Sequence, residues 1–215
     1  MPTLDKTPAP AFDYEELIAE LEIPFQKREA VQPLKAGNYV YDLILKKENI
    51  NRRLAFKNGE IHGSVLLRKF AGKPLVISFF STQWKEYGLH HLKQLNRLQS
   101  EINALGANVL IITPDAMDDT LTEIIWNNSL YLNFYYDEDC TIAKTFKVYS
   151  DQYPTWNRYP GIDVNLPLLA TYIIDAEHQI VFAEIDETLE QGISANNLLE
   201  ILHLRPFEEL KSKSA

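Results

Sequence analysis

The residues whose type and spacing could do chemistry follow an apolar run at positions 75–80. This run leads into a short turn, residues 81–85, and then into a long amphipathic segment. A strand, a turn and a helix in this order can hold a thiolate at the helix N-terminus, where the helix dipole and the free N–H groups lower a thiol pKa. The turn contains no cysteine. Lys85 stands at its end, and Gly88 follows three residues later.

Lys85 is a candidate for binding an anion. An ammonium group beside a helix N-terminus is electrostatically unfavourable unless an anion joins it. Together with Thr82, Gln83 and the N–H groups near Tyr87 and Gly88, the lysine could bind a carboxylate, a phosphate or a sulfate. The alternative is a side chain that extends into water or pairs with a nearby acid such as Glu86.

Cys140 is the only cysteine, so the chain can form neither an internal disulfide nor a paired-thiol redox centre. Three acidic residues, 137–139, precede it, and their negative charge raises the pKa of a thiol. A helix beginning at Cys140 would lower that pKa instead. We expect a non-catalytic cysteine, with an intermolecular disulfide or redox sensing as alternatives.

Neither the paired histidines nor the acidic cluster predicts a metal site. His90 and His91 are adjacent, so on a helix they point about 100° apart and do not face one ion. We expect both to lie at the surface or to be half-buried. Asp115, Asp118 and Asp119 precede a helical pattern and are expected to cap it, with a site for a hard cation as the alternative.

Aromatic residues are concentrated between positions 149 and 166. Tyr149, Tyr153, Trp156 and Tyr159 alternate with polar residues and prolines, so they do not form the apolar stripe of a helix. We expect a folded loop close to the turn at 81–85. The alternative is a surface that binds a peptide or another ligand.

The composition excludes several classes of protein. The 215 residues are 46% hydrophobic, enough for one core, and 21 Lys and Arg against 30 Asp and Glu give a formal charge of −9. No basic run is present, which argues against nucleic-acid binding. No apolar run is long enough for a membrane span, and the start of the chain lacks the features of a signal peptide. These patterns predict a soluble, cytoplasmic protein without a cofactor.

The order of apolar patterns predicts an α/β domain. A first helix begins near Asp13 and ends by Pro24, and we divide the chain into an extension at 1–34, a domain at 35–205 and a polar tail at 206–215. Stretches 39–45 and 61–67 are expected to form a hairpin or an edge segment. The remaining strands are predicted at 75–80, 108–112, 132–136, 168–175 and 179–184, and the helices at 89–105, 118–126, 141–146 and 194–203.

Several strings in this order resemble the redoxin superfamily, in particular peroxiredoxin-like proteins of the AhpC/TSA type. The resemblance covers roughly residues 35–203. It implies a thioredoxin-like fold, a central mixed β-sheet flanked by helices. It rests on Gly72-Lys73-Pro74 with the apolar run after it, Trp84, the strand from Gly106 to Pro114, Tyr136-Asp137 with Ala143 and Phe146, and Ala170-Thr171-Tyr172-Ile173-Ile174-Asp175.

The departures from this pattern concern chemistry. On the family's pattern Lys85 stands where the peroxidatic cysteine would be, and Gly88 replaces the second cysteine. A peroxidatic thiolate attacks the O–O bond and takes the oxygen as a sulfenic acid, which neither residue can do. Leu169 stands where redoxins often carry a cis proline, and we expect a trans peptide or a different loop there. The degenerate site comprises Thr82, Trp84, Lys85 and Gly88, and the candidate ligand cleft comprises Thr82, Gln83, Trp84, Lys85, Tyr87 and Leu169.

The function expected from these residues is binding without thiol peroxidase activity. The ligand would be a partner protein or a small anion. The competing hypothesis is a thiol-dependent antioxidant oxidoreductase that uses Cys140 or a thiol of its partner. A third possibility is a subunit of a homodimer, because such domains often pair through an edge strand or an apolar loop.

Overall fold

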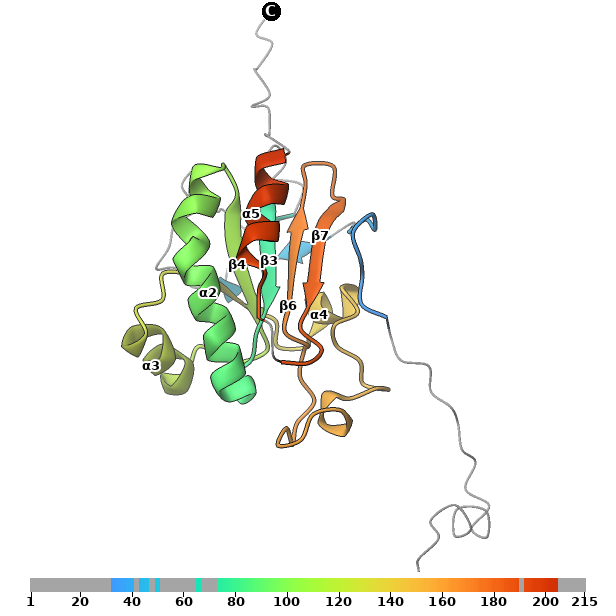
Figure 1. Ribbon diagram of the computed structural model, residues 1–215. Helices are drawn as coiled ribbons and strands as arrows, with labels where there is room; N and C mark the ends of the chain where they lie inside the picture. The colour runs from blue at the N-terminus through green and yellow to red at the C-terminus, as the bar shows by residue number, and fades with distance from the viewer. Residues whose placement is uncertain are drawn as a thin grey trace, which may run out of the picture.

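A five-stranded mixed sheet forms the centre of the domain (Figure 1). This computed structural model describes residues 32–40, 43–46, 49–50, 65–66, 73–189 and 192–204. The helix expected near Asp13, most of the extension at 1–34 and the tail at 206–215 lie outside these residues. The strand order is β5-β4-β3-β6-β7, with β3 Leu75–Phe79, β4 Asn108–Thr113, β5 Asn133–Tyr136, β6 Ala170–Ile174 and β7 Ile180–Ile185.

The directions of the strands follow from their connections. β3, β4 and β5 are parallel, because helices join them, whereas β6 runs antiparallel to both β3 and β7. The mixed sheet predicted from the sequence is therefore confirmed. A second, two-stranded antiparallel sheet pairs β1 Ile44–Leu45 with β2 Val65–Leu66, in agreement with the expected hairpin.

Apolar layers cover both faces of the sheet, which explains why β3 is a continuous apolar run with all its residues buried. One layer includes α2 Lys85–Ala104, α3 Asp119–Asn127 and α5 Ala195–Leu204, through Leu92, Leu95, Leu121, Leu198 and Leu202. The opposite layer includes α4 Thr141–Thr145 and the segment after it, through Ile142, Ala143, Phe146 and Val148. No helix in the described part of the chain is both long and apolar enough to cross a bilayer.

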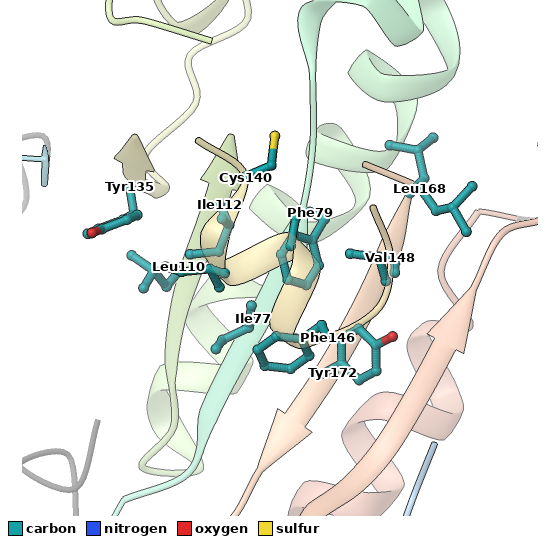
Figure 2. Close-up of a cluster of buried hydrophobic side chains, with 14 of the residues drawn as sticks. Ile77, Phe79, Leu110, Ile112, Tyr135, Cys140, Phe146, Val148, Leu168 and Tyr172 are labelled. Atoms are coloured by element: carbon teal, nitrogen blue, oxygen red, sulfur yellow. The ribbon is translucent and has the colours of Figure 1, made fainter. Parts of the chain in front are cut away.

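Three aromatic rings fill the centre of the second layer (Figure 2). The ring centroids of Phe79 and Phe146 are 5.2 Å apart, and those of Phe146 and Tyr172 are 4.9 Å apart. Phe79 also meets Tyr172 edge-on. These contacts join β3, β6 and the end of α4, so the segment that follows α4 is anchored to the sheet.

A buried polar cluster fixes α2 on the other face. Ser78 of β3 and Thr171 of β6 are paired across the sheet, and their hydroxyl oxygens are 3.0 Å apart. His91 of α2 lies above them, with its Nε2 atom 2.7 Å from the Ser78 oxygen and 3.3 Å from that of Thr171. His91 is fully buried, so the expectation of a surface or half-buried residue is wrong at this position, whereas His90 is exposed as expected.

The environment of His91 favours its neutral form. Burial, with a smaller contribution from the charge of His90, lowers its pKa from 6.5 to about 3. Its Nδ1 atom has no hydrogen-bond partner among the described residues, so a second proton there would gain no acceptor. Protonation is therefore unfavourable in the folded state.

Acid should destabilise the protein through His91. Because its pKa is lower in the folded state, the unfolded chain binds one more proton between pH 6.5 and about 3, and stability falls as the pH falls through that range. The expected contribution is about 1.4 kcal/mol per pH unit. Urea unfolding of the native protein and of His91→Gln at a series of pH values measures it. The variant should lose this slope, and His90→Gln should keep it; equal slopes for all three proteins would contradict the assignment.

Gly88 is required by packing at the start of α2. A Cβ atom at this position would lie 2.9 Å from Phe80 Cε2 and 2.9 Å from the Cβ of Trp84. Real Cβ atoms essentially never approach so closely, and both neighbours are buried. A cysteine at position 88 would meet the same obstruction, so this departure from the family pattern has a steric consequence.

We expect Gly88→Ala to destabilise the protein by about 1–3 kcal/mol, because overpacking outweighs the gain of about 1 kcal/mol in helix propensity. Ser100→Ala, at an exposed position of the same helix, is the matched control and should change stability by less than about 0.5 kcal/mol. Chemical denaturation of the two variants measures both changes. A variant Gly88→Ala as stable as the native protein would show that α2 can move away from β3.

Candidate functional site

The turn after β3 is held by a carboxylate from the end of β4. Ser81 caps the short helix η3 Thr82–Trp84, and its hydroxyl accepts a hydrogen bond from the amide of Gln83. Asp115 accepts hydrogen bonds from the Thr82 amide and from the Ser81 hydroxyl. The carboxyl ends of two adjacent parallel strands therefore meet here. Asp115 occupies the position that a bound anion would take at Thr82.

The other acidic residues of the cluster act as the sequence predicted. Asp118 caps α3, because its carboxylate accepts a hydrogen bond from the Leu121 amide at 3.0 Å, and Asp119 lies in the first turn. Asp115 does not cap α3, which differs from the expectation, because its carboxylate accepts hydrogen bonds from Ser81 and Thr82 at the start of η3. No three His, Cys, Asp or Glu side chains in the described residues form a group that could hold a metal ion.

Trp84 lies at the bottom of the candidate site. Its side chain is fully buried, and its indole Nε1 donates a hydrogen bond to the carbonyl of Pro167 at 2.8 Å. The ring of Tyr159 meets it edge-on, with centroids 5.1 Å apart. The segment after α4 therefore covers the residue that precedes Lys85.

Lys85 joins the start of α2 to the loop at residues 149–166. Its backbone has a φ of 53°, a region that residues other than glycine rarely adopt, and its side chain is exposed. The ammonium group donates a hydrogen bond to the carbonyl of Gly161 at 3.2 Å. Of the two alternatives to anion binding, the exposed side chain agrees with extension into water, whereas no pairing with Glu86 or another acid is found among the described residues.

The remaining residues of the predicted cleft differ in how far their side chains are exposed. Gln83 and Tyr87 are exposed and Thr82 is half-buried, whereas Leu169 is buried directly before β6. The peptide bonds of the described residues are all trans, as expected for Leu169. Of the residues predicted to line a cleft, Gln83, Lys85 and Tyr87 are therefore exposed at the surface, whereas Trp84 and Leu169 belong to the core.

Cys140 is buried in the layer that contains Phe79 and Ile112 (Figure 2). Burial and the charge of Asp137 raise the pKa of its thiol from 9.0 to about 12, and the opposing effect of Lys144 is smaller. The residue stands at the N-cap of α4, but it makes no side-chain capping bond. The predicted rise in pKa is confirmed, with burial as the larger cause.

The amides at the start of α4 are taken by Asp137. Its carboxylate accepts hydrogen bonds from the amides of Ile142 and Ala143 at 3.0 Å. The helix N-terminus is thus already neutralised by an aspartate, so it does not lower the pKa of the neighbouring thiol.

Cys140 should react very slowly with thiol reagents in the folded protein. A rise in pKa of three units leaves about a thousandth of the usual thiolate fraction at a given pH. Reaction with a disulfide reagent such as Ellman's reagent at pH 8 should therefore be at least about 100-fold faster in urea than in buffer. Cys140→Ser provides the blank. Equal rates in urea and in buffer would show that the thiol is accessible.

The aromatic loop, residues 149–166, is an ordered structure of its own. Asn165 accepts a hydrogen bond from the Thr155 amide and donates one to the Ser150 carbonyl, both at 3.0 Å. The Thr155 hydroxyl accepts one from the Leu166 amide at 2.9 Å. These bonds close the loop around the short helix η4 Thr155–Asn157. The prediction of a folded loop close to the turn at 81–85 is confirmed by the contacts of Tyr159 with Trp84 and of Gly161 with Lys85.

Arg158 is a feature of this loop that the sequence analysis did not single out. Its guanidinium carbon lies 5.4 Å from the ring centroids of both Tyr153 and Tyr159. An arginine placed among four aromatic residues was the available signal. The loop therefore combines aromatic rings with a cation held against them.

A family model described as AhpC/TSA matches residues 51–183, more than half of the chain. The chain belongs to the AhpC/TSA family. This match confirms the resemblance drawn from the strings around Trp84 and β6. A search of curated proteins gives no match.

Solved structures with the same fold include several bacterial proteins. Peroxiredoxin Q of Xanthomonas campestris is 20% identical, with 67% of this chain and 86% of that chain covered and a TM-score of 0.54. Peroxidoxin BcpB of Mycobacterium tuberculosis is 16% identical, with coverages of 80% and 97% and a TM-score of 0.58. PrxQ of Xylella fastidiosa, a cysteine-to-serine mutant, is 15% identical, with coverages of 81% and 98% and a TM-score of 0.60. These likenesses confirm the thioredoxin-like fold.

Proposed function

We propose that this AhpC/TSA family protein has no thiol peroxidase activity and acts by binding a partner protein at the end of the sheet where α2 begins. The observation that carries the proposal is the residue found where the family pattern has its peroxidatic cysteine. Lys85 stands there, with its ammonium group bonded to the aromatic loop, and Trp84 beneath it is covered by Tyr159. A cytoplasmic location is part of the same proposal.

The chemistry of peroxide reduction needs a thiolate that can reach the peroxide. Cys140 is the only thiol in the chain, and it is buried with a pKa of about 12. Lysine cannot take an oxygen atom from a peroxide as sulfur does, because it forms no sulfenic acid. The buried thiol of Cys140 and the chemistry of Lys85 therefore both oppose the alternative of an antioxidant oxidoreductase working through Cys140.

The geometry favours a partner protein over a free small anion. The carboxylate of Asp115 already accepts the hydrogen bonds of the Thr82 amide and the Ser81 hydroxyl, and its charge would repel a second anion there. Large apolar side chains are exposed at the same end of the molecule. Tyr87 of α2 is 55% exposed, and Trp156 and Val164 of the aromatic loop are 51% and 46% exposed.

These side chains belong to segments that lie together. Figure 1 shows the start of α2 and the loop around η4 at the same end of the sheet, and the bond from Lys85 to Gly161 joins them directly. Exposed aromatic residues on an ordered surface are typical of sites where proteins bind. A second copy of the chain is one possible partner, in line with the predicted homodimer.

Peroxide consumption tests the loss of activity. We expect the purified protein, with dithiothreitol as reductant, to consume hydrogen peroxide no faster than the buffer, because no accessible thiolate is present. The Cys140→Ser variant should give the same rate. Turnover in the native protein that disappears in Cys140→Ser would contradict the proposal and assign peroxidase chemistry to Cys140.

A further inference from the structure

We propose that the partner presents a carboxylate beside an apolar side chain, and that Arg158 and Lys85 bind this carboxylate. The inference rests on the proposed function and names the chemistry of the segment that would be bound. Two cations, one buried hydroxyl and two exposed apolar side chains lie on or against the aromatic loop and support it.

The guanidinium group of Arg158 is held in place but has unused donors. The rings of Tyr153 and Tyr159 contact it at 5.4 Å each, and contacts of this kind orient a planar guanidinium without using its N–H groups. Within the described residues this side chain makes no hydrogen bond and no ion pair. An arginine fixed in this way is prepared to bind a carboxylate through two parallel hydrogen bonds.

Lys85 brings a second cation to the same loop. Its ammonium group uses one N–H on the carbonyl of Gly161, three residues after Arg158, and the side chain remains exposed. The protein has a formal charge of −9, yet neither of these cations meets a carboxylate in the described part of the chain. Two cations without a carboxylate partner, one on the aromatic loop and one against it, favour a ligand that supplies the negative charge.

Tyr159, the neighbour of Arg158 in the loop, adds an unsatisfied polar group. Its hydroxyl is buried and has no hydrogen-bond partner among the described residues, while its ring contacts both Trp84 and Arg158. Leaving a buried hydroxyl unpaired costs about 1–3 kcal/mol, and an oxygen atom of a ligand would offset this cost when binding moves aside the groups that cover the hydroxyl. Burial raises the pKa of Tyr159, so the hydroxyl keeps its proton and remains a donor.

Nearby acids limit the kind of ligand. Asp186 and Glu187 are close enough to Tyr159 to raise its pKa further, so negative charge lies on the side of β7. A highly charged polyanion would be repelled by these carboxylates, whereas a single carboxylate on the side of Lys85 is compatible with them.

Two exposed apolar side chains of the loop could contact the apolar part of the ligand. Trp156 is two residues before Arg158. The backbone of Val164 lies against Thr155, the residue before Trp156, because the Thr155 hydroxyl donates a hydrogen bond to the Val164 carbonyl at 3.5 Å. The side chains of Trp156 and Val164 are about half exposed. An acidic residue next to an aromatic or aliphatic one would therefore meet matching groups on the loop.

The test uses the full chain and two end-blocked peptides, one of composition Gly-Glu-Phe-Gly and one in which Gln replaces Glu. Nuclear magnetic resonance follows the Nε–H signal of Arg158 and the indole N–H signal of Trp156 during titration. We expect saturable shifts with the acidic peptide and binding at least about tenfold weaker with the Gln peptide, because an arginine–carboxylate contact is worth about that factor. Arg158→Gln and Lys85→Gln should each weaken binding, and Arg97→Gln, an exposed arginine of α2, should not.

Three outcomes would overturn the inference: no saturable shift at millimolar peptide, equal binding of both peptides, or unchanged binding by Arg158→Gln. Acetate alone binding as tightly as the acidic peptide would also overturn it, because it would indicate a simple anion site. Peroxide consumption is measured separately. Failure of the peptide with no turnover removes only this inference, whereas turnover that depends on Cys140 removes the proposed function itself.

Discussion

The hydrogen bond between Ser78 and His91 is the contact on which the arrangement of the candidate site depends. It lies where β3, β6 and α2 meet, and both side chains are buried. A polar group in such a place must find its partner, so the helix is restricted to one rotation and one height above the sheet. α2 begins only six residues before His91, and this restriction therefore also fixes the directions of Trp84 and Lys85.

The candidate site differs from an open pocket because neighbouring segments occupy it. The carboxylate of Asp115 holds the turn, Tyr159 covers Trp84, and the carbonyl of Gly161 holds the ammonium group of Lys85. These contacts come from the end of β4 and from the aromatic loop, and together they hold the turn and cover Trp84. The side chains of Gln83, Lys85 and Tyr87 and the outer surface of the aromatic loop remain accessible.

The regular elements could be predicted because their signals are local. The apolar run at 75–80 and the spacing of leucines after Leu89 locate β3 and α2 to within a few residues. The burial of His91 could not be predicted, because Ser78 and Thr171 are 13 and 80 residues away from it in the sequence. The contact of Arg158 with two tyrosine rings depends on the path of a loop without periodicity, and no local pattern indicates it. The direction of the Cys140 pKa followed from neighbouring charges, whereas its burial is a property of the tertiary structure.

The crowding around Gly88 has an evolutionary consequence. Replacement of Lys85 by cysteine would place a sulfur atom at position 85, but all three bases of the codon must change. A second cysteine at position 88 has no room while Phe80 and Trp84 keep their places. Recovery of a two-cysteine site would thus require several substitutions together, and the early ones would lower stability without restoring activity. Descendants of such a protein are expected to keep the fold and to diverge at the surface of the loop, where substitutions have the smallest structural cost.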